Sequence, residues 1–379
     1  MADVIDAVAA YRKLTGRSPG GLWSSPGRVN LMGDHTDYSE GLALPFAIDR
    51  SAVVAAGLRE DARVRCASRQ MPAEVVMALD DISPDVGAGW AAPVLGALWG
   101  LRRAGVTVPG VDLVVDSDIP LGGGLASSAA VAVAVALAVT ELTGQHMAHN
   151  DIARCCRDGE AAIAGAPTGL LDQVAVLAGR AGHVVFLDCR TLDRELIAFQ
   201  PAEVSAALMV IDTAVAHSNS AAGYRARREQ SAQAATVLGV QSLRDATADA
   251  VEHSMHGVLQ RRARHIVAEN TRVRRIVELL RTGQIHAIGR VLDDSHASLR
   301  DDYEVSSAEL DVAVVAAREA GAWGARMTGA GFGGCAIALV PVYARETVAA
   351  AVHTAFARQG FGAPTVFEVA TADGARRCA

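Results

Sequence analysis

The chain has 379 residues, and its 35 Lys and Arg against 42 Asp and Glu give a formal net charge of −7, without the concentrated basic surface that nucleic-acid binding needs. Only one of the basic residues is a lysine, Lys13, and it lies in a predicted N-terminal helix. P-loop enzymes, protein kinases and Schiff-base enzymes each need a lysine in the site, so the composition argues against all three classes.

Helices and strands are predicted to alternate through the first half of the chain. Residues 2–14 carry apolar side chains at helical spacing. A helix over 127–142 is almost wholly apolar, so we expect it to be buried on all sides. Another helix is predicted at about 150–164. Strands bounded by turn residues are predicted at 28–32, 51–58, 64–67 and 111–115.

The second half is predicted to form a separate α+β unit. Strands are predicted near 183–188 and 207–213, and arginine-rich helices over 223–280. The chain then alternates between helix and strand around a glycine-rich turn, at 307–320, 335–340, 345–358 and 365–369. At about 150 residues per domain the length also suggests two domains.

The sequence carries no sign of export or of a membrane span. Its longest apolar run, 129–139, is too short to cross a bilayer, and the N-terminus lacks the features of a signal peptide. Its six cysteines show neither a CxxC pair nor disulfide-like spacing. We therefore expect a cytoplasmic protein with reduced thiols that binds no membrane and acts as a monomer.

The segment Pro-Leu-Gly-Gly-Gly-Leu-Ala-Ser-Ser at 120–128 leads directly into the apolar helix. Glycines let backbone N–H groups approach a ligand, and a helix N-terminus carries a partial positive charge, so the segment predicts an anion site. Ser127 and Ser128 could cap the helix, or ligate a metal and bond to phosphate. A plain glycine turn is the alternative, since the segment matches neither the P-loop nor the dinucleotide fingerprint.

Two further segments combine polar or glycine residues with a strand. Residues 26–38, Pro-Gly-Arg-Val-Asn-Leu-Met-Gly-Asp-His-Thr-Asp-Tyr, gather hydrogen-bonding groups suited to a polyhydroxyl ligand. A metal site or a solvated turn would be alternatives, but no second cluster that could complete a metal shell is identifiable. Residues 326–335, Arg-Met-Thr-Gly-Ala-Gly-Phe-Gly-Gly-Cys, indicate backbone packed tightly against a loop or a ligand.

Together these three segments, in this order, resemble the three motifs of the GHMP small-molecule kinases, and the segment at 26–38 resembles the galactokinase signature. Further similarity at 165–173, 224–228, 262–265 and 298–306 extends the resemblance over nearly the whole chain. The resemblance implies a two-domain α+β fold with the active site in the cleft between the domains. Residues 1–185 would form a mixed β-sheet with helices, and residues 186–379 a ferredoxin-like α/β sandwich.

The resemblance also implies an activity: ATP-dependent phosphorylation of the C1 hydroxyl of D-galactose to α-D-galactose 1-phosphate, the first committed step of the Leloir pathway. By similarity Asp172 would be the catalytic base, with Arg28 beside it stabilising the charge of the transferring group. The positions that match the sugar contacts of the family are Asp34, His35, Thr36, Asp37, Gly169, Asp172 and Tyr224.

For the nucleotide, the family holds ATP phosphates by backbone N–H groups, which agrees with a chain that has one lysine. Ser128 and Glu160 would hold Mg²⁺ by similarity, and Ser68 and Trp90 fall where the family contacts the nucleotide. The residues expected to cradle the phosphates are Gly122, Gly123, Gly124, Leu125, Ala126, Ser127 and Ser128.

Three departures from the family pattern limit the resemblance, and the first of them bears on the substrate. Asp34 replaces the usual glutamate, which is longer by one methylene, so recognition of the sugar C6 hydroxyl is in doubt. Thr168 replaces a common cysteine and is expected to matter little, and Ser307-Ala308 replaces Cys-Pro at a helix entrance.

Five alternatives to galactose phosphorylation follow from the family. The acceptor could be N-acetylgalactosamine or arabinose instead of galactose. Mevalonate and homoserine are disfavoured, because kinases for them lack the run at 35–38. A non-catalytic sugar and ATP sensor is also disfavoured, because residues 126–129 are complete and Arg28 and Asp172 are both present.

Overall fold

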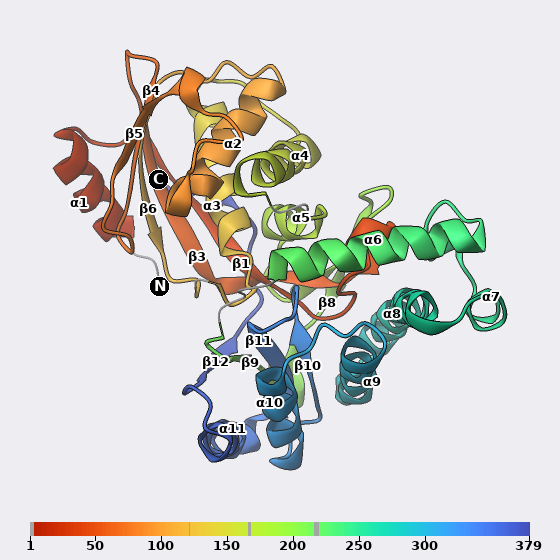
Figure 1. The fold of residues 1–379 in the computed structure, drawn as a ribbon. Coiled ribbons are helices and arrows are strands. Elements are labelled where there is room, and N and C mark those ends of the chain that lie inside the picture. The colour runs from red at the N-terminus through yellow and green to blue at the C-terminus, as the bar shows by residue number, and fades with distance from the viewer. Residues whose placement is uncertain (1–3, 121, 166–167, 216–219) are drawn as a thin grey trace.

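The computed structural model describes residues 4–120, 122–165, 168–215 and 220–379, in two halves that each contain a β-sheet (Figure 1). In the first half a six-stranded sheet has the spatial order β13-β1-β3-β6-β4-β5. Only the β4–β6 pairing is parallel, so the predicted mixed sheet is confirmed. The strands are β1 (Gly21–Asn30), β3 (Pro45–Leu58), β4 (Arg63–Ser68), β5 (Val75–Ala78), β6 (Val111–Ser117) and β13 (Arg376–Arg377).

Helices cover both faces of this sheet. Helix α1 (Val4–Thr15) packs on one face, against Val53 and Ala55, and the other helices pack on the opposite face, which presents Val54 and Ala56. This alternation is the period-two pattern of a strand that is buried on both sides. The helices of the second face are α2 (Ala92–Arg103), α3 (Ser127–Leu142), α4 (His149–Gly159) and α5 (Leu171–Ala178).

Helix α3 lies at the centre of that layer. It packs on β1 and β3 and is enclosed by α2, α4 and α5. Apart from Val131, its alanine and valine side chains are buried on every side, as the sequence predicted, because small residues let three helices and a sheet approach one axis. The N-terminus of this buried helix is thereby held in a fixed position.

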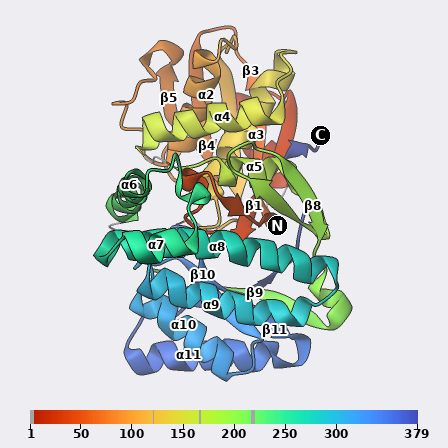
Figure 2. The same cartoon turned by 90° about the vertical axis from the view of Figure 1, so that its right-hand side faces the viewer.

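The second half contains a four-stranded antiparallel sheet in the order β10-β11-β9-β12. With α10 between β9 and β10, and α11 between β11 and β12, the connectivity is βαββαβ, which confirms the predicted ferredoxin-like sandwich. Figure 2 shows the helices of this half stacked along it, from α8 at the top to α11 at the bottom. The elements are β9 (Ala206–Asp212), β10 (Gly324–Thr328), β11 (Cys335–Pro341), β12 (Thr365–Val369), α6 (Ser220–Leu238), α7 (Ala248–Ser254), α8 (Gly257–Arg281), α9 (Ile288–Asp301), α10 (Ala308–Glu319) and α11 (Arg345–Gln359).

The two halves share structure at their junction. A small sheet in the order β2-β7-β8 joins β2 (Leu42–Ala43), β7 (His183–Asp188) and β8 (Arg194–Ala198). One apolar cluster includes residues of β1, β9 and β11, and strand β13 returns from the C-terminal half to pair with β1. The division of the chain at 185/186 stays a prediction.

Several predicted bounds were wrong. The strand predicted at 28–32 is β1, which begins earlier, at Gly21. The prediction missed its first half because that half contains a Ser-Ser-Pro run and is followed by a bulge between Pro26 and Arg28. The helix predicted to reach residue 164 ends as α4 at Gly159 and continues as a π-helical turn, Glu160–Ala164.

All six cysteines are free thiols. Among the described residues, no helix is both long and apolar enough to span a membrane.

Candidate active site

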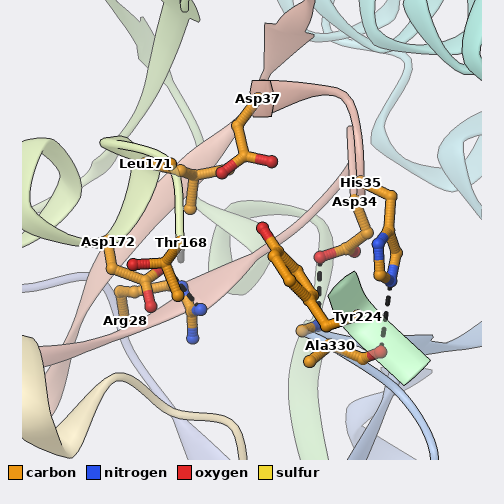
Figure 3. A pocket seen from close by; sticks show the side chains of 11 residues that line it. Arg28, Asp34, His35, Asp37, Thr168, Leu171, Asp172, Tyr224 and Ala330 are labelled. Carbon is orange, nitrogen blue, oxygen red and sulfur yellow. Dashed lines mark hydrogen bonds and ion pairs between the residues drawn. The ribbon is translucent and has the colours of Figure 1, made fainter. Parts of the chain in front are cut away.

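A pocket between the two halves gathers most of the residues predicted to bind sugar (Figure 3). Asp172 and Arg28 lie together on one side, and Asp34, His35 and Ala330 lie on the other. The lining residues are Arg28, Asp34, His35, Asp37, Thr168, Gly169, Leu171, Asp172, Tyr224, Gly329 and Ala330.

The polar side chains after β1 reach this pocket through a sharp turn. Gly33 has φ 96°, and a Cβ there would lie 2.5 Å from the Leu42 carbonyl oxygen, so only glycine fits. His35 also adopts a left-handed conformation, with φ 64°. The structure does not bring Thr36 to the pocket. Its buried hydroxyl lies 2.9 Å from the Gly33 carbonyl oxygen and 2.7 Å from that of Leu42, so it holds the turn.

Arg28 and Asp172 form an ion pair in the pocket. Arg28 Nη2 lies 2.6 Å from Asp172 Oδ1, and Arg28 Nη1 donates a 2.5 Å hydrogen bond to the Gly124 carbonyl. The guanidinium therefore joins the carboxylate to the glycine loop before α3. Asp172 is in the first turn of α5, whose N-terminal dipole favours a negative charge there.

Asp34 is held from behind by a buried charge network. Its Oδ2 pairs with Arg326, and its Oδ1 accepts a 3.0 Å hydrogen bond from the Gly329 N–H. Burial nevertheless raises the pKa of Asp34, because desolvation outweighs the attraction of Arg326. Arg326 is fully buried and also lies 3.7 Å from Glu269. Both oxygens of Asp34 are therefore already engaged by protein donors.

His35 lies against the third glycine motif. The distance from Nε2 to the Ala330 carbonyl oxygen is 3.1 Å, and since a carbonyl can only accept, Nε2 carries the hydrogen. Nδ1 lies 2.8 Å from the Tyr38 hydroxyl. Burial lowers the pKa of His35 to about 3, so the ring is neutral at physiological pH and Nδ1 accepts from Tyr38.

Asp37 faces Asp172 across the pocket and is packed against Gly169. A Cβ on Gly169 would lie 2.0 Å from Asp37 Oδ2, so any side chain there would displace the carboxylate. Burial and the charge of Asp172 raise the pKa of Asp37 to about 6. The pocket therefore contains a hydrogen-bond acceptor whose charge changes near neutral pH.

The glycine loop before α3 meets the third glycine motif. Gly122, Gly124 and Ala126 all have positive φ, and a Cβ on Gly329 would lie 3.2 Å from the Gly124 carbonyl oxygen. The N-cap of α3 is Ala126, which offers no side-chain cap, so neither serine caps the helix. The first N–H groups of α3 remain available to an anion. Leu121 lies outside the described residues.

A second pocket lies on the other side of the α3 N-terminus. It brings Ser68 and Trp90 together with Ser127 and Ser128, as the predicted nucleotide site requires. Its wall is mostly apolar, which suits a flat heterocycle. The remaining lining residues are Gln70, Met71, Pro93, Val115, Ser117, Ile119 and Val131.

Glu160 lies between the two pockets, at the start of the π-helical turn. Its Oε1 accepts a 2.8 Å hydrogen bond from the Ser128 hydroxyl, so the predicted metal ligands are neighbours. Its Oε2 accepts 3.0 Å bonds from Thr168 and Gln173. Burial, followed by the charge of Asp172, raises the pKa of Glu160. Among the described residues, no three His, Cys, Asp or Glu side chains form a metal-binding group by themselves.

Sequence reasoning missed some residues of the pocket. Thr168 was expected to matter little, yet it lines the pocket between the two halves and bonds to Glu160. Ala330 and Gly329 were noted only as parts of a glycine motif, although their backbone groups bond to His35 and Asp34. The glycine motif itself was visible in the sequence. The residues that it contacts, Asp34 and His35, lie 295 residues away, so no local pattern reveals the pairing.

Comparison with known proteins identifies the family. The galactokinase galactose-binding signature matches residues 9–58, the N-terminal domain of the GHMP kinases residues 92–180, and their C-terminal domain residues 276–360. A galactokinase of Streptomyces coelicolor is 43% identical over 97% of this chain and 96% of its own. The chain belongs to the galactokinase family.

Other relatives are consistent with this assignment to the galactokinases. A Roseiflexus galactokinase is 36% identical over 100% of this chain and 98% of its own. The crystal structure of Lactococcus lactis galactokinase complexed with galactose has a TM-score of 0.94 at 29% identity, and covers 99% of this chain and 100% of that one. A mevalonate kinase of L. major, at 17% identity and TM-score 0.63 over 94% of this chain and 98% of its own, shares the fold.

Proposed function

We propose that this member of the galactokinase family transfers the γ-phosphoryl group of ATP to the C1 hydroxyl of D-galactose, releasing ADP. The observation that carries the proposal is the Arg28–Asp172 ion pair, which lies between the polar pocket and the glycine loop before α3. A sugar hydroxyl bound in the pocket would meet a carboxylate that faces the phosphate site. The galactokinase relatives and the galactose complex support this choice of sugar.

In the proposed reaction Asp172 accepts the proton of the C1 hydroxyl as that oxygen attacks the γ-phosphorus. The planar guanidinium of Arg28 can fork between the carboxylate and the transferring group. Phosphate oxygens would be held by the backbone N–H groups of 122–128 and by the N-terminus of α3, since no lysine lies in the site.

The residues present fit a magnesium ion beside the phosphates. Ser128 and Glu160 offer oxygen donors 2.8 Å apart, and such donors are the ones that Mg²⁺ prefers. Ser128 and Glu160 would hold the ion, which when bound neutralises charge on the phosphates. The other ligands would be phosphate oxygens and water, as is usual for this metal in kinases.

Thr168→Val is expected to weaken magnesium binding, so that a higher magnesium concentration is needed to reach the same reaction rate. The substitution keeps the shape of the side chain but removes a hydroxyl that orients Glu160, and such supporting bonds affect metal affinity by roughly 10-fold or more. Initial rates of ADP release, measured against magnesium concentration, would show a higher half-saturation point. Thr140→Val is the control, because that hydroxyl bonds only within α3. Identical magnesium curves for Thr168→Val and the wild type would contradict the role of Thr168.

Substrate profiling tests the proposed sugar directly. We expect ADP release to be fastest with D-galactose among galactose, N-acetylgalactosamine and arabinose. Because Arg326 and the Gly329 N–H already donate to the two oxygens of Asp34, we expect any further bond from a C6 hydroxyl to this carboxylate to be weak, and 6-deoxygalactose to be turned over within about tenfold of galactose. Strong rejection of the 6-deoxy sugar would show that Asp34 does read C6. Binding of sugar and ATP without ADP release would favour the sensor alternative.

Asp37→Asn is expected to stabilise the fold at pH 7 while weakening sugar binding. The pKa of Asp37 is raised to about 6, so the folded state binds a proton more tightly than the unfolded chain, and stability from this group falls as pH rises from about 4 to 6. Removing the charge should therefore raise the melting temperature at pH 7 but not at pH 4. It should also raise the KM for galactose. Asp85→Asn, at an exposed position, is the control for both measurements.

A further inference from the structure

A chain of hydroxyl groups runs from the pocket into the C-terminal half. The Tyr38 hydroxyl, which lies 2.8 Å from His35 Nδ1, is 2.7 Å from the Tyr303 hydroxyl. The Tyr303 hydroxyl is in turn 2.8 Å from the Ser231 hydroxyl. Tyr303 is fully buried and Ser231 nearly so, which means that bulk water does not compete for these bonds.

The direction of every bond in this chain follows from its first member. Since the Ala330 carbonyl can only accept, His35 carries its hydrogen on Nε2, and the neutral ring must accept at Nδ1. Tyr38 therefore donates to His35. The Tyr38 hydroxyl has one hydrogen, which it donates to His35, so it accepts from Tyr303. By the same reasoning the Tyr303 hydroxyl accepts from Ser231.

The chain also joins segments that are distant in sequence. His35 and Tyr38 belong to the turn after β1, Tyr303 follows α9, and Ser231 lies on α6. Helix α6 carries Tyr224 two turns before Ser231, and the Tyr224 ring lies 5.4 Å from the His35 ring inside the pocket. Residues seven apart share one face of a helix, so the bond to Ser231 helps to set the position of Tyr224.

We propose that Ser231, Tyr303 and Tyr38 form a one-directional hydrogen-bond relay that fixes His35 and Tyr224 against the sugar pocket. Ser231, Tyr303 and Tyr38 are thereby positioning residues for the sugar. The proposal rests on the proposed function only for the identity of the sugar. The relay does not contact the nucleotide pocket, whose lining residues come from other segments. Its loss should therefore affect the sugar and spare ATP.

Tyr303→Phe tests the relay because it keeps the ring and removes only the hydroxyl. We expect the KM for galactose to rise about fivefold, the effect of one neutral hydrogen bond, while the KM for ATP stays unchanged. The ¹⁵N resonance of His35 Nδ1 should move in Tyr38→Phe, move less in Tyr303→Phe and least in Ser231→Ala. A side chain that served only to fill space would not produce this order. Tyr11→Phe, which removes the hydroxyl of a buried tyrosine outside the relay, on α1, is the control.

The two readouts separate this proposal from the proposed function. Should the wild type release no ADP with galactose, the proposed function fails, and the ¹⁵N series still tests the relay. Ser231→Ala is the smallest change and serves if Tyr303→Phe does not fold. An unmoved His35 Nδ1 resonance in both Ser231→Ala and Tyr303→Phe overturns the proposal. Equal rises in the KM for galactose and for ATP in Tyr303→Phe also overturn it.

Discussion

Asp172→Asn is expected to abolish phosphoryl transfer while ATP binding stays intact. An amide has the size of the carboxylate and can still bond to Arg28, but it cannot accept the proton of the attacking hydroxyl. Loss of a general base typically costs about 10²–10⁴-fold in rate. Coupled ADP-release rates with galactose would measure the loss, and calorimetry with ATP would measure binding.

Two controls make the Asp172 result specific. Asp158→Asn changes an exposed carboxylate on α4 that also pairs with an arginine, and it should leave the rate unchanged. Galactose should still bind to Asp172→Asn, because Asp34, His35 and Tyr224 remain in place. Turnover close to that of the wild type would remove Asp172 from the role of base and leave the ion pair with a purely structural purpose.

The fold and much of the pocket could be predicted because three dense motifs carry them. Glycines and polar residues at 26–38, 120–128 and 326–335 stand out against the apolar strands and helices around them, and the structure brings all three together. The backbone conformation explains why these motifs were visible in the sequence. A residue such as Gly33, whose Cβ would clash with a carbonyl, has one acceptable identity, so the sequence records the conformation.

Side-chain direction within a motif could not be predicted. Thr36 lies between two pocket residues in sequence. The left-handed conformation of His35 nevertheless turns the Thr36 hydroxyl away from the pocket, toward the carbonyls of the turn. The role of Thr168 was missed for a related reason. Its partner Glu160 reaches it from a π-helical turn, which the apolar pattern of an ordinary helix does not distinguish.

Long-range charge pairing was equally hidden from the sequence. In the sequence Arg326 stands out only as the first residue of a glycine motif, and Glu269 is one residue of the arginine-rich helices predicted over 223–280. In the structure both are fully buried. Although burial opposes it, the charges of Arg272 and then Arg326 lower the pKa of Glu269 to about 2. A residue type gives no sign of burial when its partner is distant in the sequence, as Asp34 is from Arg326 and Arg326 from Glu269.

Arg326→Met is expected to destabilise the protein by about 3–5 kcal/mol, the range for breaking a buried ion pair by removing one partner. Methionine fills a similar volume, but Asp34 loses the arginine it pairs with and Glu269 keeps only Arg272 of the two arginines beside it in the described part of the chain. Urea-induced unfolding would measure the change in free energy. Adding Asp34→Asn should recover part of the loss, because the second change removes the carboxylate left without a partner.

Arg345→Met provides the comparison that gives this prediction its meaning. Arg345 lies 2.6 Å from Glu368 in an equally close pair, but both side chains are exposed, at 41% and 49%, and loss of such a pair costs about 1 kcal/mol or less. The two substitutions are chemically identical, so burial alone separates their expected effects. Equal losses in the two variants would mean that water reaches Asp34 once Arg326 is gone. The pocket wall behind the sugar would then be held by packing, and Asp34 would be free to face a ligand.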